Sequence, residues 1–264
     1  MADAWREPID WEAVARAEQD PLPGPAQVYT QRQCLAALMK GLARARVAVE
    51  WDGDDPLAIL QTDLWTESVA RSRQLLEEGL RRARGAGYFV SRRSTYGIDV
   101  SGFTCARAAG QLDANVAQAD IRSLPFRPGS FDVIFDPSTI DHVPEEDTCA
   151  VIGQYHRALR PGGVVVLVFS HRTGTLRRDA GHSYFVFDPE VIKRELEDHG
   201  MRPVAEYAIC CLNTQPAGIL TSHRLRVSRL AYGVFSVVEY LPLSRMALGR
   251  LAPLWVIIAK KEAP

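Results

Sequence analysis

The sequence predicts an α/β fold: a doubly wound, mostly parallel sheet of seven strands with helices on both faces, preceded by a helical N-terminal extension. Segments with strand and helix patterns alternate from residue 51 onward, which is typical of strand–helix–strand units in a parallel sheet. The stretch VVVLVFS at 164–170 is apolar throughout, as in a strand that is buried on both faces. Residues 1–50 have helical spacing and no strand pattern.

Each element follows from a local pattern. Strands are expected where short apolar and β-branched runs lie between turn residues, and helices where apolar residues recur every three or four positions. The expected strands are 55–61, 95–101, 115–121, 131–136, 164–170, 204–213 and 254–261. The expected helices are 10–20, 26–48, about 62–84, 102–111, 145–160 and 188–200, with a helical insertion at about 222–250.

Glycine and proline mark the helix ends. Asp188 is expected as the N-cap of a helix that has Pro189 in its first position. Gly85-Ala86-Gly87 is expected to end the helix before the second strand. It is not a ligand-binding glycine turn, because Asp99 follows 99 − 87 = 12 residues later, which is too few for a crossover helix and a strand. The patterns therefore divide the chain into a helical extension or lid at 1–50 and an α/β domain at 51–264.

The composition excludes several classes of function. The chain has 264 residues, 47% of them hydrophobic, and a net charge of −1, which gives no sign of a nucleic-acid partner. No apolar run approaches the ~20 residues of a bilayer span, and the acidic N-terminus is unlike a signal peptide. The five cysteines are scattered without a C-x-x-C pair, so neither a disulfide framework nor a metal site is expected. These features predict a cytoplasmic protein whose oligomeric state stays open.

Three aspartates follow consecutive expected strands. Asp99, Asp120 and Asp136 each lie at or near the carboxyl end of a strand. In open α/β sheets, ligands bind beyond these ends, at the point where the strand order reverses. We therefore expect the three carboxylates to share one ligand site.

The segment that contains two of these aspartates carries a set of spaced motifs. Residues 119–171 contain D-x-x-x-L-P-F, then S-F-D-V-I, then x-H-V, and finally L-R-P-G-G. With GIDVS upstream, their order and spacing resemble the class I, Rossmann-like, S-adenosylmethionine-dependent methyltransferases, most closely the small-molecule enzymes such as those of ubiquinone and menaquinone biosynthesis. The resemblance implies a Rossmann-like methyltransferase domain, S-adenosyl-L-methionine as cofactor, and methyl transfer to an O, N or C nucleophile of a small molecule.

The resemblance also assigns roles to single residues. Asp99, with Ser101 beside it, would hold the ribose hydroxyls of the cofactor. Asp120 would accept a hydrogen bond from the adenine amino group, while Ile121 would donate its backbone N–H and cover the ring. The residues implied beside the methionine part are Asp136 and Ser138.

The chain departs from the family pattern at the turn after the first strand. The glycines of E/D-x-G-x-G-x-G are missing, and QTDLWTE is the expected replacement, with Thr62 or Asp63 as N-cap and Glu67 in the first helical turn. Carboxylates at that position would repel the pyrophosphate of a dinucleotide, whereas S-adenosylmethionine carries a cationic sulfonium and ammonium. Leu64 and Trp65 are bulky where the family has glycine, which leaves the fit of the methionine part open.

The candidate catalytic residues lie after the fourth strand. Methyl transfer requires an aligned nucleophile and, for a hydroxyl or a protonated amine, a proton acceptor. Asp141 and His142 in TIDHVPEE are the expected catalytic residues, and His171 and Tyr184 are further candidates. Two other functions stay open: a non-catalytic binding or partner protein, and an enzyme that uses the same fold and cofactor for another reaction.

Overall fold

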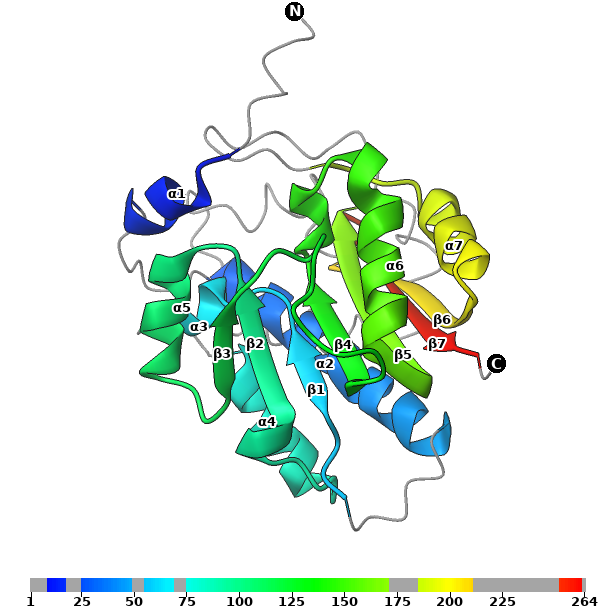
Figure 1. The fold of residues 1–264 in the computed structure, drawn as a ribbon, viewed down its shortest axis with the longest axis horizontal. Helices are drawn as coiled ribbons and strands as arrows, with labels where there is room; N and C mark the ends of the chain where they lie inside the picture. The colour runs from blue at the N-terminus through cyan, green and yellow to red at the C-terminus, as the bar shows by residue number, and fades with distance from the viewer. Residues whose placement is uncertain are drawn as a thin grey trace, which may run out of the picture.

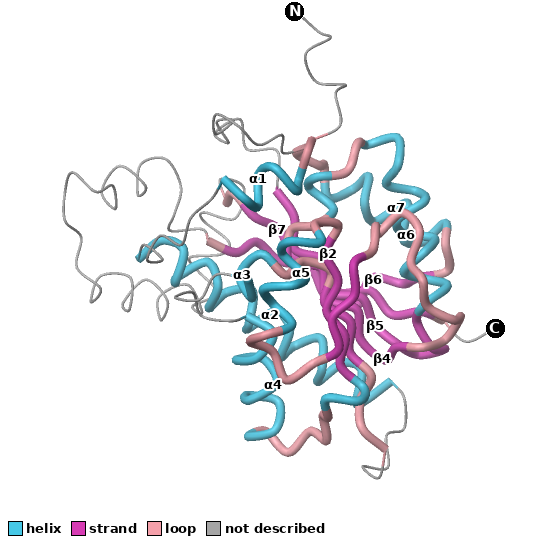
Figure 2. Tube along the Cα trace, turned by 60° about the vertical axis from the view of Figure 1, so that its left-hand side comes forward, coloured by secondary structure: helices cyan, strands magenta, loops and turns pink. Residues whose placement is uncertain are grey.

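The computed structural model describes residues 9–17, 25–48, 55–68, 75–170, 185–210 and 252–262. Within these ranges a seven-stranded sheet lies between two layers of helices (Figures 1 and 2). The strands are β1 (Ile59–Gln61), β2 (Thr95–Asp99), β3 (Asn115–Gln118), β4 (Phe131–Pro137), β5 (Leu159–Ser170), β6 (Met201–Ile209) and β7 (Leu254–Lys261). Their order is β3-β2-β1-β4-β5-β7-β6, with β7 antiparallel to both neighbours and all other pairs parallel. The predicted doubly wound, mostly parallel sheet is confirmed.

Helices cover both faces of this sheet. Figure 2 views the sheet nearly edge-on and shows α2, α3, α4 and α5 on one side, with α6 and α7 on the other. The α-helices are α1 (Trp11–Ala17), α2 (Pro25–Ala48), α3 (Trp65–Ser68), α4 (Leu75–Gly85), α5 (Gly102–Ala109), α6 (Thr148–Ala158) and α7 (Pro189–Asp198). No helix in the described ranges is both long and apolar enough to cross a bilayer.

The two faces of the sheet bury two separate hydrophobic cores. Strand β5 contributes to both, because successive side chains point to opposite faces. One set of β5 side chains packs with α2, α4 and α5, and the alternate set packs with α6 and α7. The two sets are Val164, Val166 and Val168, and Val165, Leu167 and Phe169, all fully buried. This pattern explains why the sequence of β5 is apolar throughout.

The N-terminal helices agree with the helical pattern of residues 1–50. In α2, Leu35, Leu38 and Leu42 are at most 1% exposed and belong to the core on that face of the sheet. Of the two helices, α2 is therefore packed into the core of the sheet. The division at residue 50 stays a prediction.

Several helix ends lie where the sequence predicts them. The Asp188 side chain accepts a hydrogen bond from the Glu190 N–H at 3.0 Å, with Pro189 first in α7. Helix α4 ends at Gly85, and Gly87 has a φ of 81°. In place of one helix over about 62–84, the structure describes α3 and α4. Trp5, Cys211, His171, Tyr184 and the insertion expected at 222–250 lie outside the described residues.

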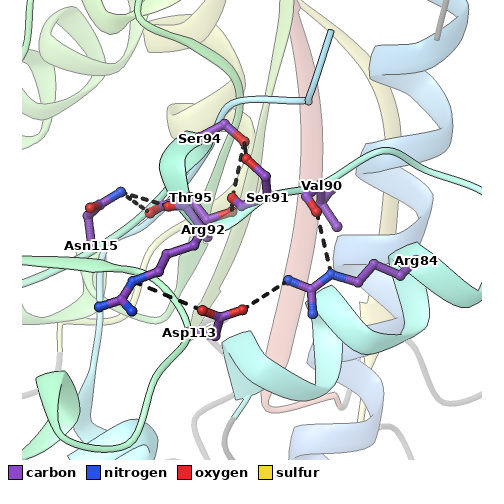
Figure 3. Close-up of polar contacts among 8 residues, drawn as sticks. All are labelled: Arg84, Val90, Ser91, Arg92, Ser94, Thr95, Asp113 and Asn115. Carbon is purple, nitrogen blue, oxygen red and sulfur yellow. Dashed lines mark hydrogen bonds and ion pairs between the residues drawn. The ribbon is translucent and has the colours of Figure 1, made fainter. Parts of the chain in front are cut away.

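Charged side chains are paired at the amino ends of β2 and β3 (Figure 3). Asp113 lies between the guanidinium groups of Arg84 and Arg92, at 3.5 and 4.0 Å. Asn115 Nδ2 donates to the carbonyl oxygens of Arg92 and Thr95, at 2.7 and 3.1 Å. At this edge of the sheet, two guanidinium groups therefore share one carboxylate.

A residue of the glycine-free turn after β1 packs against a glycine in the neighbouring strand. The side chain of Leu64 is fully buried and packs against Gly97 of β2, where an added Cβ would lie 2.5 Å from Leu64 Cδ2. Gly97 is paired in register with Gln61, the last residue of β1. A glycine in β2 therefore gives space to the bulky residue that replaces a glycine after β1.

We expect Gly97→Ala to destabilise the fold by about 1–2 kcal/mol, because the new methyl group overpacks the site of Leu64. The free energy of unfolding in urea measures this loss. Adding Leu64→Val to Gly97→Ala should recover part of it.

Gly85→Ala is the matched control, since nothing lies within 4 Å of a Cβ at that position. If Gly97→Ala were as stable as the native chain, the packing of Leu64 against Gly97 would be disproved.

Candidate active site

The carboxyl ends of β1, β2 and β4 lie side by side, and an acid lies at or near each. Gln61 at the end of β1 is paired in register with Gly97 in β2 and Phe135 in β4. The acids that follow these positions interact electrostatically with one another. We call them the carboxylate cluster: Asp63, Glu67, Asp99 and Asp136.

The turn after β1 contains no glycine, and hydrogen bonds from and to side chains fix its conformation. Gln61 Nε2 donates to the carbonyl oxygen of Asp63 at 2.6 Å and to Glu67 Oε1 at 3.0 Å. Asp63 Oδ1 accepts the Trp65 N–H at 2.6 Å, and Glu67 Oε1 accepts the Leu76 N–H at 2.8 Å. Two buried acceptors, Gln61 Oε1 and Glu67 Oε2, have no hydrogen-bond partner. The turn therefore offers two buried oxygens to a donor.

Asp99 connects the ends of β1 and β2. Its Oδ2 accepts the Leu64 N–H at 3.2 Å, and its Oδ1 accepts the Ser101 N–H at 2.9 Å. An ionised carboxylate has about four lone-pair sites, so each oxygen of Asp99 has capacity for a further donor.

Asp136 holds the loop that follows β4. It is fully buried, and its Oδ1 accepts the N–H groups of Thr139 at 2.6 Å and Ile140 at 3.3 Å. Its Oδ2 accepts the Tyr155 hydroxyl at 2.8 Å. The hydroxyls of Thr62 and Thr139 are 2.7 Å apart, which joins the turn after β1 to the same loop. Asp136 thus fixes the position of the loop after β4 through buried hydrogen bonds.

Asp141 fixes an unusual backbone conformation. It is fully buried and accepts the Ser138 hydroxyl at 2.5 Å, the Ser170 N–H at 2.9 Å and the Ser170 hydroxyl at 2.8 Å. Ser138 has a φ of 84°, a conformation that non-glycine residues rarely adopt and that occurs most often at functional sites. Hydrogen bonds within the protein occupy both oxygens of Asp141.

The end of β3 leads to a more open acid. Asp120 is ion-paired with Arg122 at 2.7 Å, and Arg122 also reaches Asp147 at 3.0 Å. The next side chain, Ile121, is 5% exposed and packs in the core that includes α6. Asp120 is therefore accessible but already paired.

Helix α1 lies over α5 and reaches the loop after β4. Glu12 Oε2 accepts the Ser101 hydroxyl at 2.8 Å and the Phe103 N–H at 3.1 Å, at the start of α5. The rings of Trp11 and His142 meet edge to face, with centroids 4.5 Å apart. Helix α1 thus spans the region above the carboxyl ends of β2 and β4.

This arrangement can be compared with known proteins. Residues 76–167 match a family model described as a methyltransferase domain. An uncharacterized methyltransferase of Mycobacterium sp. (strain KMS) is 28% identical over 163 residues, which are 58% of this chain and 62% of the relative's length. Residues 76–167 are therefore similar to a methyltransferase domain, and the sheet has the fold of the class I methyltransferases.

Solved structures share the fold of this chain. Phosphoethanolamine N-methyltransferase 2 of Haemonchus contortus, in complex with S-adenosyl-L-methionine, has a TM-score of 0.53 at 16% identity over 86% of this chain and 53% of that one. The [4+2]-cyclase SpnF has a TM-score of 0.51 at 16% identity over 94% of this chain and all of that one. At these identities the likeness concerns the fold.

The carboxylate cluster has no cationic partner in the part of the chain that the structure describes. Burial raises the pKa of Glu67 to about 7 and that of Asp136 to about 6. Burial and then the neighbouring charge of Asp99 raise the pKa of Asp63. Burial likewise raises the pKa of Asp141, to about 7. The ionised cluster is therefore a place where a cation gains free energy.

A cavity of about 500 Å³ opens at the opposite edge of the sheet. Its lining comes from residues at and near the amino ends of β1, β2 and β4. They are Asp55, Pro56, Ala58, Arg93, Ser94, Tyr96, Phe126, Ser130, Phe131 and Arg160. None of the predicted site residues belongs to this lining.

The structure brings Asp63, Asp99 and Asp136 together, while Asp120 is paired with Arg122. It also adds residues that the sequence did not single out. Gln61 is predicted as the end of a strand and the first residue of QTDLWTE, but the sequence gives no role to its amide, which holds the turn. Tyr155 lies mid-helix with no motif to mark it. Glu12 reaches Ser101 across 89 residues of chain, a contact that only the fold creates.

Asp63→Asn should stabilise the ligand-free protein near pH 8 by about 1–2 kcal/mol. The folded-state pKa of Asp63 lies above the unfolded value, so its ionisation costs stability as pH rises from about 4 toward that raised pKa. Asparagine keeps the acceptor for the Trp65 N–H. Urea denaturation at both ends of this pH range measures the effect.

Near pH 4 the variant and the native chain should be equally stable. Glu146→Gln, an exposed acid outside the cluster, is the matched control. A stabilisation by Asp63→Asn that does not change with pH would contradict the electrostatic explanation.

Proposed function

We propose that this chain binds S-adenosyl-L-methionine at the carboxylate cluster and transfers the methyl group to an O, N or C nucleophile of a small molecule. The observation that carries the proposal is the cluster itself, with acids near the ends of three strands and no described cation paired with them. A cationic ligand would relieve the repulsion among these acids. The pyrophosphate of a dinucleotide would increase it.

The residues of the cluster fit this cofactor in charge and in hydrogen bonding. An ammonium group has three N–H donors, and Gln61 Oε1 and Glu67 Oε2 are buried acceptors that lack a donor. Asp99 retains lone pairs on both oxygens, which suits the two hydroxyls of a ribose. The Leu64 side chain is buried against Gly97 in β2. We infer that Thr62 and Asp63 border the methionine part.

The adenine end of the cofactor is assigned to the segment after β3. We propose that Asp120 accepts from the adenine amino group and that the Ile121 N–H donates to the ring. Asp120 already pairs with Arg122, so adenine would share this carboxylate.

The bound cofactor supplies a methyl group that is already activated by its sulfonium. The chain has to hold the acceptor in line and keep water out, and such positioning is worth about 7–11 kcal/mol. Asp136 and Asp141 are suited to this task, because they fix the loop that bears Ser138. Helix α1 is placed to exclude water from the same region through Trp11.

Of the two predicted catalytic residues, His142 is the better placed to accept a proton. Asp141 is fully buried and both of its oxygens accept hydrogen bonds, so we propose a positioning role for it. His142 is only half-buried and borders the region that α1 covers. It would accept the proton of a hydroxyl as the methyl group is transferred, or that of a protonated amine before transfer, since an ammonium nitrogen has no lone pair.

Asp99→Asn and Asp99→Ala should weaken S-adenosylmethionine binding at least tenfold. The loss of the hydrogen bonds that the ribose hydroxyls donate to the charged carboxylate corresponds to about 1.5–3 kcal/mol. Isothermal titration calorimetry measures the affinity, and circular dichroism verifies that each variant is folded.

Glu146→Gln, remote from the cluster, should bind as the native chain does. If the native chain bound no cofactor at millimolar concentration, a non-catalytic role would be supported instead. Binding without methyl transfer to any candidate acceptor would support another reaction on this fold.

The affinity for S-adenosylmethionine should rise with pH from about 5.5 to about 7.5, below the range in which an α-amino group loses its proton. The raised pKa of Glu67, about 7, means that this acid ionises within this window. A cationic ligand binds the ionised form better. In Glu67→Gln the affinity should be lower and should depend less on pH. Calorimetry across this range measures both, and an affinity that falls with pH in the native chain would contradict the proposed electrostatics.

A further inference from the structure

Outside the carboxylate cluster, helices α6 and α7 bring three potential metal ligands together. Cys149 lies in the first turn of α6, while Glu195 in the last turn of α7 and His199 directly after it are four residues apart. Their ligand atoms all lie within 4.8 Å of one another. Residues separated by four positions lie on the same face of a helix, so Glu195 and His199 approach α6 together.

The imidazole of His199 is oriented as in metal sites. Its Nδ1 lies 2.8 Å from the carbonyl oxygen of Glu195, which can only accept, so Nδ1 is the protonated nitrogen. The other nitrogen, Nε2, therefore presents its lone pair toward Cys149 Sγ, 3.8 Å away. A backbone carbonyl that fixes the tautomer in this way is the usual partner of a metal-bound histidine.

The distances suit a tetrahedral ion that prefers sulfur and nitrogen. Zinc lies about 2.3 Å from cysteine sulfur and about 2.0–2.1 Å from histidine nitrogen, so the two atoms are ~3.6 Å apart at the tetrahedral angle. The observed 3.8 Å between Cys149 Sγ and His199 Nε2 is within 0.2 Å of that value. One carboxylate oxygen of Glu195 supplies a third ligand of a type that zinc accepts.

The imidazole of His199 packs on α6. Gly153 lies one helical turn after Cys149, and a Cβ at Gly153 would lie 3.4 Å from His199 Nε2, at ordinary van der Waals distance. The ring is therefore held against the same face of α6 that bears Cys149.

We propose that Cys149, Glu195 and His199 form a zinc site that joins α6 to α7, with three protein ligands and a fourth position open to water. Cysteine binds zinc as the thiolate, so binding releases the Cys149 thiol proton to the solvent. The site is made of residues on the opposite face of the sheet from α5, and it does not depend on the proposed methyl transfer.

The full chain, treated with chelator and then titrated with Co²⁺, tests this site. We expect one equivalent of Co²⁺ to bind with an intense near-ultraviolet thiolate-to-cobalt band, and Zn²⁺ to displace it. Cys149→Ser should abolish the band. Glu195→Gln and His199→Gln should each weaken binding at least tenfold.

Two controls separate loss of a ligand from loss of the fold. Glu197→Gln changes an exposed acid on the same helix and should bind Co²⁺ as the native chain does. Zn²⁺ should raise the unfolding temperature of the native chain but not that of Cys149→Ser, although both should unfold alike without metal. A native chain without the band, or a Cys149→Ser variant that retains it, would overturn the proposal.

Discussion

Repulsion among carboxylates dominates the carboxyl ends of β1, β2 and β4. Parallel pairing in register places Asp63, Glu67, Asp99 and Asp136 at one edge of the sheet, and the fold removes much of their solvent. Most of the local structure reduces the cost of that crowding. Backbone N–H groups solvate Asp99 and Asp136, and the amide of Gln61 solvates Glu67. These donors compensate only part of the negative charge, and a ligand of positive charge can compensate the rest.

The turn after β1 can lack glycine because a glycine in β2 supplies the space that the side chain of Leu64 needs. Glycines in this turn normally permit close approach of a ligand to the backbone. Here the side chain of Leu64 turns inward and fills the space above Gly97, while the amide of Gln61 holds the turn. Motif searches that require glycine at the turn overlook this solution, because the compensating glycine belongs to β2.

Periodicity predicted the fold well because a strand that is buried on both faces of the sheet has an apolar residue at nearly every position. The apolar run of β5 and the N-cap at Asp188 are local signals, and both were confirmed. The fourth and second strand ends were also legible, since Asp99 and Asp136 follow strong strand patterns. The expected strand at 115–121 was too long, because β3 ends at Gln118 and Asp120 lies in the turn beyond it.

The roles of the site residues were harder to predict from the sequence, because they depend on which carboxylate oxygens already accept hydrogen bonds within the protein. The sequence favours Asp141 slightly over His142, yet the hydrogen bonds that Asp141 accepts from Ser138 and Ser170 make it part of the framework. The zinc ligands were also invisible, since Cys149 and His199 are 199 − 149 = 50 residues apart and form no spacing pattern. Long-range contacts of this kind arise only from the packing of α6 against α7.

The contact of Glu12 with the start of α5 has a thermodynamic consequence. The docked carboxylate of Glu12 lies close enough to Asp99 to disfavour its ionised form, after burial has done so. A neutral donor that selects the ionised form of Asp99 therefore opposes the docking of α1. Linkage makes the effect reciprocal: docking of α1 must weaken the binding of that donor by the same factor. A helix remote in sequence thereby becomes an energetic competitor of the ligand.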